Sequence, residues 1–187
     1  PIAASANEDL QYALGQLKTD KCTFLLSGSG GEFGPALVMS FLIRRKLNYF
    51  STFVPTVAGS ALCYLILLSN KLLFGENSFL TQIDPIFEYN GESYRAIKHL
   101  NDLNLELKYK SRDVFQYVYS YLELILKQDK CLLLTKPQLG TPSKIIERFM
   151  GKEEHESSVR FSEMEDLNLN IAQTDSETIS LGKELIN

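Results

Sequence analysis

The stretch Val54-Pro-Thr-Val-Ala-Gly-Ser60-Ala-Leu-Cys-Tyr-Leu-Ile-Leu-Leu68 contains a strand end, a turn of small residues and the start of an apolar helix. The residues before Pro55 favour a buried strand, and the apolar run from Ala61 favours a helix. Ser60 therefore lies at a helix N-terminus, where unpaired N–H groups and the helix dipole stabilise anions. A serine there is suited to act as a nucleophile. The alternative is that Ser60 only caps the helix.

A second stretch, Leu25-Leu-Ser-Gly-Ser-Gly-Gly-Glu-Phe-Gly34, repeats this arrangement of apolar strand, glycine turn and helix. Two such strand ends in one parallel sheet form a crevice at its carboxyl edge, where α/β folds bind ligands. We expect residues 25–26 and 53–54 to lie in neighbouring parallel strands. Gly30 and Gly31 should then face Ser60 across the crevice.

The remaining first half of the chain alternates between strand and helix patterns. We expect helices at residues 7–17 and 32–47, and strands at residues 22–26, 49–54 and 71–74. This order implies right-handed crossovers and a mainly parallel sheet.

The pattern changes after Pro85. Asn90-Gly91, between aromatic and polar residues, is a hairpin signal. Helices are expected at residues 94–103, 114–126 and 141–150, and the chain after Gln173 is polar and expected to pack loosely. The apolar, tyrosine-rich face of residues 114–126 could pack on the same chain or on a neighbouring subunit.

Composition sets limits on the function. The chain has 187 residues, 44% of them hydrophobic, which is enough for one domain with a sizeable core. A net charge of −4 with mixed signs gives no electrostatic case for a nucleic-acid partner. Cys22, Cys63 and Cys131 show no metal-ligand spacing and suit free thiols in a reducing, cytoplasmic compartment. The longest apolar run, residues 61–68, is too short to cross a bilayer.

Three stretches together carry a family resemblance. The block Ser27-Gly-Ser-Gly-Gly31, the block around Ser60, and Gly75-Glu-Asn-Ser-Phe-Leu-Thr-Gln-Ile-Asp84-Pro85 resemble those of the serine dehydrogenase proteinase family. That family belongs to the Clp-protease/crotonase superfamily and is related to signal peptide peptidase A. A fourth segment, from His155 to Ile171, resembles the late part of the family, so the match runs over about residues 21–171.

The resemblance implies an α/β fold, a Clp-protease/crotonase-like superhelix of strand-strand-helix units with a mainly parallel sheet. It would form one domain over residues 1–172, with a helical insertion at about 92–150 and a polar tail at 173–187. Superfamily members assemble into rings or trimers, which implies a homo-oligomer formed through the late helices.

The implied activity is that of a serine hydrolase, most simply a peptidase, which forms an acyl-enzyme on Ser60 and needs no cofactor or metal. Its substrate would be a peptide or protein. The oxyanion donors would be the backbone N–H of Ala61 and one N–H from Gly30 or Gly31, because glycine permits close approach without a side chain.

The general base is harder to assign. In Clp-type subunits a histidine follows the serine by a strand and a turn, and here that place holds Asp84. The later acid position holds His155, so base and acid look exchanged. We interpret His155 as the base and Asp84 as the residue that orients its imidazole, since these roles define a triad regardless of chain order. Alternatively, Asp84 is a turn residue before Pro85 and His155 a surface residue.

A lysine is the rival base, because the signal peptide peptidase branch uses a serine–lysine dyad. Lys98, Lys108 and Lys110 fall in the corresponding region. Such a lysine must be desolvated to lose its proton near neutral pH, and all three lie in polar local sequence.

Some residues depart from the family pattern. Ser29 stands where proline is usual, Gln82 replaces a small residue or proline, and Leu62-Cys63 replace small residues after the serine. A bulky Leu62 could crowd the acyl pocket. A catalytically inactive scaffold that binds peptides or assembles therefore stays open beside the hydrolase. A crotonase-type acyl-CoA enzyme fits less well, since enolate chemistry does not need the Ser60 block.

Overall fold

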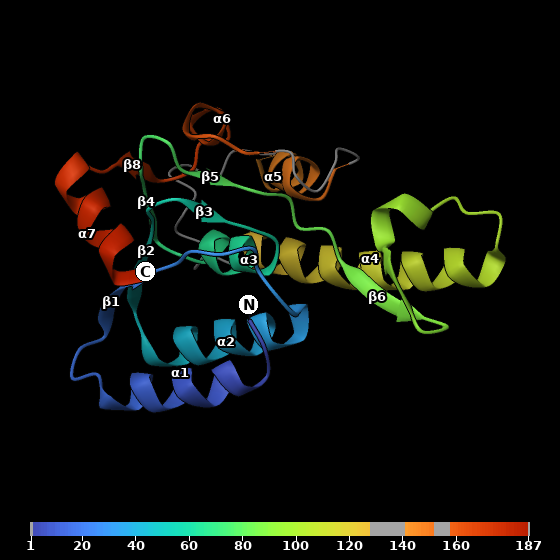
Figure 1. Ribbon diagram of the computed structural model, residues 1–187, viewed down its shortest axis with the longest axis horizontal. Coiled ribbons are helices and arrows are strands. Elements are labelled where there is room, and N and C mark those ends of the chain that lie inside the picture. Colours follow the sequence, from blue (N-terminus) through green and yellow to red (C-terminus); the bar gives the residue numbers. More distant parts are fainter. Residues whose placement is uncertain (1, 128–140, 152–157, 187) are drawn as a thin grey trace.

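The computed structural model describes residues 2–127, 141–151 and 158–186 (Figure 1). In chain order its elements are α1 (Ser5–Gln16), β1 (Lys21–Leu25), α2 (Phe33–Lys46), β2 (Tyr49–Val54), β3 (Val57–Ala58), α3 (Ala61–Leu67), β4 (Lys71–Phe74), β5 (Phe79–Leu80), β6 (Ile86–Tyr89), β7 (Glu92–Arg95), the 3-10 helix η1 (Ala96–His99), α4 (Leu105–Lys127), α5 (Thr141–Met150), α6 (Phe161–Asp166), β8 (Ile171–Gln173) and α7 (Ser176–Ile186).

The main sheet has four parallel strands in the order β1-β2-β4-β8. Leu25 pairs with Phe53, which confirms the expected neighbouring parallel strands. Aromatic and β-branched residues dominate β2, as suits a strand buried in the middle of a sheet. The predicted helices and strands of the first half are thereby confirmed to within a residue or two.

A second, smaller layer of strands follows the first. β3 pairs with β5 in parallel, Gly28 forms a bridge with Ala58, and Leu80 forms an antiparallel bridge with Val159. The chain after each of β1, β2 and β4 thus continues into this second layer before the next helix. The result is the expected α/β fold of strand-strand-helix units with a mainly parallel sheet.

The two layers of strands and the helices packed on them form the body of the molecule, and α3 is its central helix. Every residue from Ala61 to Leu67 is buried, and α2 packs against α3 while α1 packs against α2 (Figure 1). A helix apolar on all sides is stable only inside a protein core. No helix in the described parts of the chain is both long and apolar enough to span a membrane.

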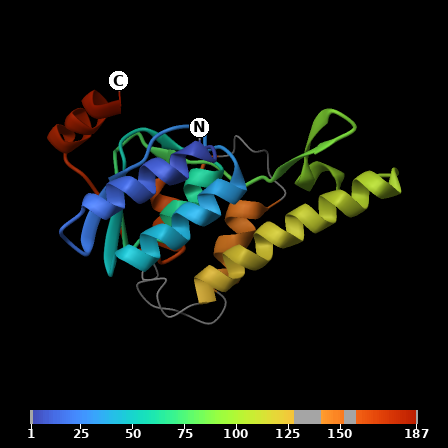
Figure 2. The same ribbon diagram turned by 90° about the horizontal axis from the view of Figure 1, so that it is seen from below.

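An arm projects from this body in both ribbon views (Figures 1 and 2). It consists of the β6–β7 hairpin, η1 and the first half of α4. Asn90 and Gly91, with φ of 52° and 80°, form the expected tight turn.

The helix expected at residues 94–103 is wrong. The two strands of the hairpin stay paired as far as Ile86 and Arg95. Within residues 96–103, the helical part is limited to the short 3-10 helix η1. The expected helix at residues 114–126 is confirmed but begins earlier, because the Asn104 side chain accepts the N–H groups of Glu106 and Leu107.

The residues after Gln173, expected to pack loosely, form the helix α7. The Asp175 carboxylate accepts the N–H of Thr178 at 2.8 Å, which caps the helix start. Gly182 is buried, and a Cβ there would lie 2.5 Å from the Phe53 ring. Close contact at this glycine therefore holds α7 against the carboxyl end of β2.

Asn70 links three strands of the main sheet. Its side-chain oxygen accepts the Phe50 N–H at 2.8 Å, its own N–H donates to Phe50 O, and its carbonyl accepts the Asn170 side chain at 2.7 Å. Asn70 is 1% exposed. Asn70→Ala leaves the buried Phe50 N–H unpaired, so we expect it to lower the free energy of unfolding by about 1–3 kcal/mol.

Chemical denaturation followed by circular dichroism measures this loss. Asn77→Ala, in an exposed turn, is the matched control and should change the free energy of unfolding by less than about 0.5 kcal/mol. Equal, small effects of both substitutions would show that Asn70 does not hold the strands together.

Candidate active site

Ser60 occupies a sharp turn between β3 and α3. Its φ of 49° and ψ of −116° lie in a sparsely populated region for a residue with a side chain. Its hydroxyl makes no cap hydrogen bond to α3, so the side chain does not act as a helix cap. A strained strand-to-helix turn that exposes a serine hydroxyl is the geometry of a nucleophile elbow.

Thr81 and Cys63 hold this turn in place. The Ser60 N–H donates to Thr81 Oγ1 at 3.1 Å. The Cys63 thiol lies 3.1 Å from both Ala58 O and Thr81 O. Burial raises the pKa of the Cys63 thiol to about 12, so it stays protonated and can donate. Sequence reasoning missed Thr81, because a contact across 21 residues leaves no local signal.

The glycine loop, residues 28–31 between β1 and α2, lies directly against Ser60. A Cβ on Gly30 would come within 2.6 Å of Gly59 O and 2.8 Å of Ser60 Cβ, and Gly30 has a φ of 107°. Only glycine fits there. Among the residues that the structure describes, none accepts a hydrogen bond from the N–H of Gly30, Gly31 or Ala61. Of these three residues, Gly31 is exposed, whereas Gly30 and Ala61 are buried.

Ile2 fixes the other side of the glycine loop. Its N–H donates to Gly30 O at 2.8 Å, and its carbonyl accepts the Glu32 N–H at 2.9 Å. This bridge at Gly31 positions the loop and the start of α2 as one unit.

A pocket of about 340 Å³ opens beside Ser60, where the arm meets the body. Gly31, Ser60, Ala61 and Asp84 all line it, together with apolar residues from α2 and α4. Leu62 lines a different, apolar cavity, so the expected crowding of the acyl pocket by Leu62 is wrong. Residues of α1, α2, β1 and β2 line that cavity together with Leu62.

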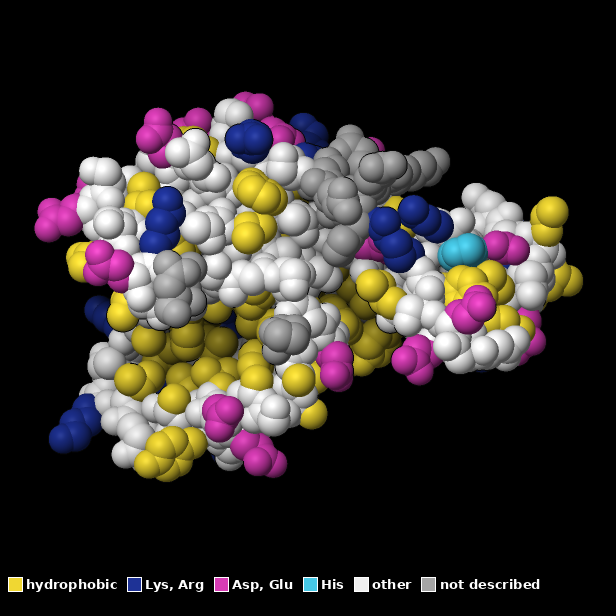
Figure 3. Space-filling model, viewed as in Figure 1, with side chains coloured by type: hydrophobic (Ala, Val, Ile, Leu, Met, Phe, Trp, Pro, Cys, Tyr) yellow, Lys and Arg dark blue, Asp and Glu magenta, His cyan; other side chains and the backbone are white. Residues whose placement is uncertain are grey.

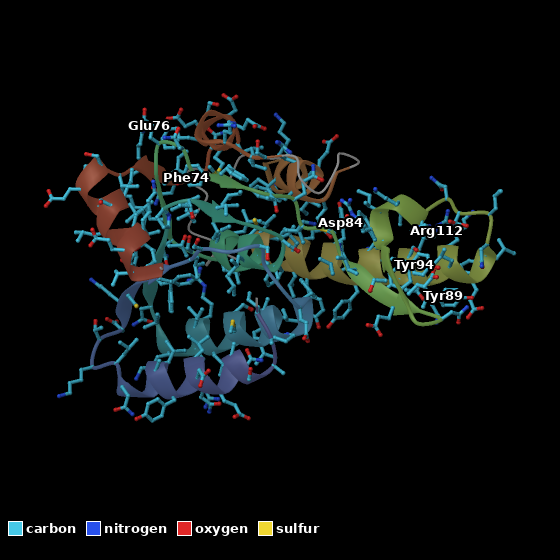
Figure 4. The ribbon with its side chains drawn as sticks, in the orientation of Figure 1. Phe74, Glu76, Asp84, Tyr89, Tyr94 and Arg112 are labelled. Atoms are coloured by element: carbon cyan, nitrogen blue, oxygen red, sulfur yellow. The ribbon has the colours of Figure 1, made fainter. Side chains whose placement is uncertain are left out.

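Asp84 is 4% exposed and lies at the junction of body and arm (Figure 4). Its Oδ2 accepts a hydrogen bond from Arg95 Nε, while Oδ1 has no partner among the described residues. An unpaired buried carboxylate oxygen is unusual and calls for a ligand or a further partner. Sequence reasoning missed Arg95, since only the hairpin brings it back to Asp84.

The other candidate residues lie elsewhere. His155 is outside the described residues, as is Cys131. Lys98 and Lys110 are exposed on the arm, where Lys110 Nζ lies 4.6 Å from the centre of the Tyr89 ring, and Lys108 is half-buried. None of these lysines lines the pocket beside Ser60. The described residues contain no His/Cys/Asp/Glu group suited to a metal ion.

Neither a protein-family model nor a curated protein matches this sequence. Solved structures do match its fold. The membrane-bound stomatin-specific protease 1510-N, as a point mutant, aligns with a TM-score of 0.66 and 12% identity over 97% of this chain and 79% of its own.

ClpP1 from Listeria monocytogenes aligns with a TM-score of 0.57 and 12% identity, over 94% of this chain and 89% of that one. A point mutant of the same ClpP1 gives a TM-score of 0.56 and 13% identity over 95% and 90%. Identities this low show the fold alone. The chain therefore has a ClpP-like fold, and the strained turn at Ser60 lies within it.

Proposed function

We propose that the protein is a serine hydrolase that cleaves peptide bonds through an acyl-enzyme on Ser60, as its resemblance to the serine dehydrogenase proteinase family implies. One observation carries the proposal. Ser60 sits in a strained strand-to-helix turn, its hydroxyl does not cap α3, and it lines a pocket. Strain of this kind costs about 1–3 kcal/mol and persists where function requires it.

The oxyanion hole of this proposal uses backbone groups. Attack by Ser60 Oγ on a carbonyl carbon moves negative charge onto the carbonyl oxygen. The N–H of Ala61 and one N–H from Gly30 or Gly31 stabilise that charge. The contact of Gly30 with Ser60 and the lack of any other described acceptor for these N–H groups support this assignment.

His155 serves as the base, and Asp84 orients it. The described residues on either side of the His155 segment support this proposal. Phe149 O accepts the Ile83 N–H at 2.7 Å, and Val159 pairs with Leu80. Both anchors therefore lie on β5 or on the segment that leads from β5 to Asp84. Asp84 Oδ1 has no described partner and can accept the imidazole N–H.

An inactive scaffold that binds peptides is the second candidate. One observation favours it: no histidine or lysine is among the described residues that line the pocket. A serine without a base remains protonated and unreactive at neutral pH. The lysine dyad has less support than His155, because Lys98 and Lys110 are exposed and none of the three lysines lines the pocket.

Labelling with a fluorophosphonate separates the two candidates. We expect the unmodified protein to react covalently and Ser60→Ala not to react, since the probe bonds to the activated Oγ. Ser180→Ala, at an exposed position of α7, is the matched control and should react normally. Labelling that survives in Ser60→Ala would assign the nucleophile elsewhere, and no labelling of the unmodified protein would favour the scaffold.

His155→Ala should reduce the labelling rate by about 10²–10⁴-fold, the usual contribution of a general base. In a peptide-hydrolysis assay, the double variant with Ser60→Ala should lose no more activity than Ser60→Ala alone, because the two groups act as one unit. A normal labelling rate in His155→Ala would favour Lys98, Lys108 or Lys110 as the general base, and substitution of each lysine with methionine would test it.

Thr81→Val removes the acceptor of the Ser60 N–H while keeping the side-chain shape. We expect the labelling rate to fall by about 10²-fold, because a small misplacement of the reacting atoms costs that much. Thr81→Ser restores the hydroxyl and should restore most of the rate. Circular dichroism shows that each variant is folded, and equal rates for valine and serine would mean that Thr81 does not position Ser60.

We also propose that subunits associate through α4 and its surroundings, where large apolar side chains are exposed, among them Leu103 at 98% and Leu105 at 62%. Light scattering across a wide concentration range should show an oligomer. Leu105→Asp should weaken it, while Leu185→Asp on α7 should not; a monomer at all concentrations would contradict the proposal.

A further inference from the structure

The charged side chains among the described residues that line the pocket beside Ser60 are all acidic. Three carboxylates line it, from Glu32 at the start of α2, Asp84, and Glu88 of β6. The described lining contains no lysine, arginine or histidine. Neither Glu32 nor Glu88 forms an ion pair with any described residue. Both carboxylates are exposed and available to a ligand.

Asp84 adds to this negative charge from the inner wall. Arg95 compensates it through Oδ2, but Oδ1 is buried without a described partner. Among the described residues, one guanidinium against three carboxylates leaves the site with a net negative charge. A negative field in a low-dielectric cleft concentrates cations there.

Aromatic rings line the same pocket as the carboxylates. Phe33, Phe87 and Tyr117 come from α2, β6 and α4, and the Phe33 and Tyr117 rings meet edge to face with centroids 6.0 Å apart. Tyr117 is half exposed, so its ring can be reached from solvent. Aromatic faces attract ammonium and guanidinium groups, and apolar walls accept the methylene stem of such a side chain.

The surface view agrees with this description. Figure 3 shows hydrophobic side chains in the hollow between body and arm, below β6, with acidic side chains on either side of it. Figure 3 also shows Lys and Arg side chains at the base of the arm, above this hollow, and others over the body.

We propose that this pocket selects a peptide side chain with an apolar stem and a cationic tip, as in lysine or arginine. The inference rests on the proposed function, because it assigns the residue that the Ser60 site recognises. An apolar pocket without charges would accept a norleucine or leucine side chain equally well. The carboxylates make the difference: each exposed charge pair contributes up to about fivefold in binding, and a cation on an aromatic face about as much.

Two peptidyl phosphonate probes test this preference, because each bonds covalently to an activated serine. They differ only in the side chain next to the phosphonate, which is lysine in one and the uncharged, equally long norleucine in the other. We expect the lysine probe to react about tenfold faster with the unmodified protein. The ratio should shrink as salt rises from about 0.05 M to about 0.5 M, because Glu32 and Glu88 are exposed.

The double variant Glu32→Gln/Glu88→Gln should lower the ratio from about tenfold to about two- to fivefold, because the aromatic contact of the cation remains. Glu76→Gln is the matched control: Glu76 is exposed, lies at the far end of the body from Asp84 (Figure 4) and should leave the ratio unchanged. Neutral fluorophosphonate should label Glu76→Gln and the unmodified protein equally, which shows that Ser60 and the fold are intact. Both probe rates of the double variant are divided by its own fluorophosphonate rate, so that any change in Ser60 reactivity cancels.

The outcomes separate the inference from the function on which it rests. Equal rates for lysine and norleucine probes, in a protein that fluorophosphonate labels, overturn the cationic preference and leave the hydrolase standing. If fluorophosphonate does not label the protein, the proposed function fails. Binding to Ser60→Ala then decides the preference, using two fluorescent hexapeptides that differ only in lysine or norleucine: about tenfold tighter binding of the lysine peptide supports the pocket, and equal binding overturns it.

Discussion

The backbone of Gly30 passes so close to Gly59, Ser60 and Ala61 that no side chain fits between the two segments. The rest of the site depends on this contact. It exists because β1 and β2 pair in parallel and end at the same edge, so the turns that follow them meet. The strained conformation of Ser60 is a consequence of that meeting, as are the nearby N–H groups that have no acceptor among the described residues. Thr81, Cys63 and Ile2 hold the two turns from the outside.

The pocket depends on a second arrangement, the one between body and arm. Residues 83–88, which follow β5 and include most of β6, form one wall of the pocket. α4 returns along the arm and closes the opposite wall with Val114, Tyr117 and Val118. The Arg95 guanidinium on Asp84 ties the hairpin back to the body at this junction. The shape of the pocket is therefore set by how the arm is held, whereas the turn at Ser60 is set by the body alone.

Local sequence patterns predicted most of the body. Strand and helix periodicities located β1, β2, β4, α2 and α3, and the glycine and Ser60 blocks indicated two turns that the structure brings together. The patterns failed where contacts across the chain outweigh local preference. Residues 94–103 carry apolar positions at helical spacing, yet pairing with β6 extends the strand to Arg95. α7 has a polar sequence, and its packing depends on Gly182 meeting Phe53, a contact without local signature. Thr81 and Arg95 were missed for the same reason, because each acts on a residue distant in sequence.

The order of strands in the main sheet has a consequence for the growing polypeptide on the ribosome. β8 is the outer neighbour of β4, yet Asn170 and Asn70, which join them, are separated by 100 residues. At a synthesis rate of about 5–20 residues per second, β4 waits about 5–20 s for its partner. Leu72 and Phe74, fully buried in the finished protein, lie on a strand with one open edge throughout that interval. The nascent chain is therefore most prone to wrong strand pairing while the arm is being made, and a chaperone that covers β4 would act at that stage.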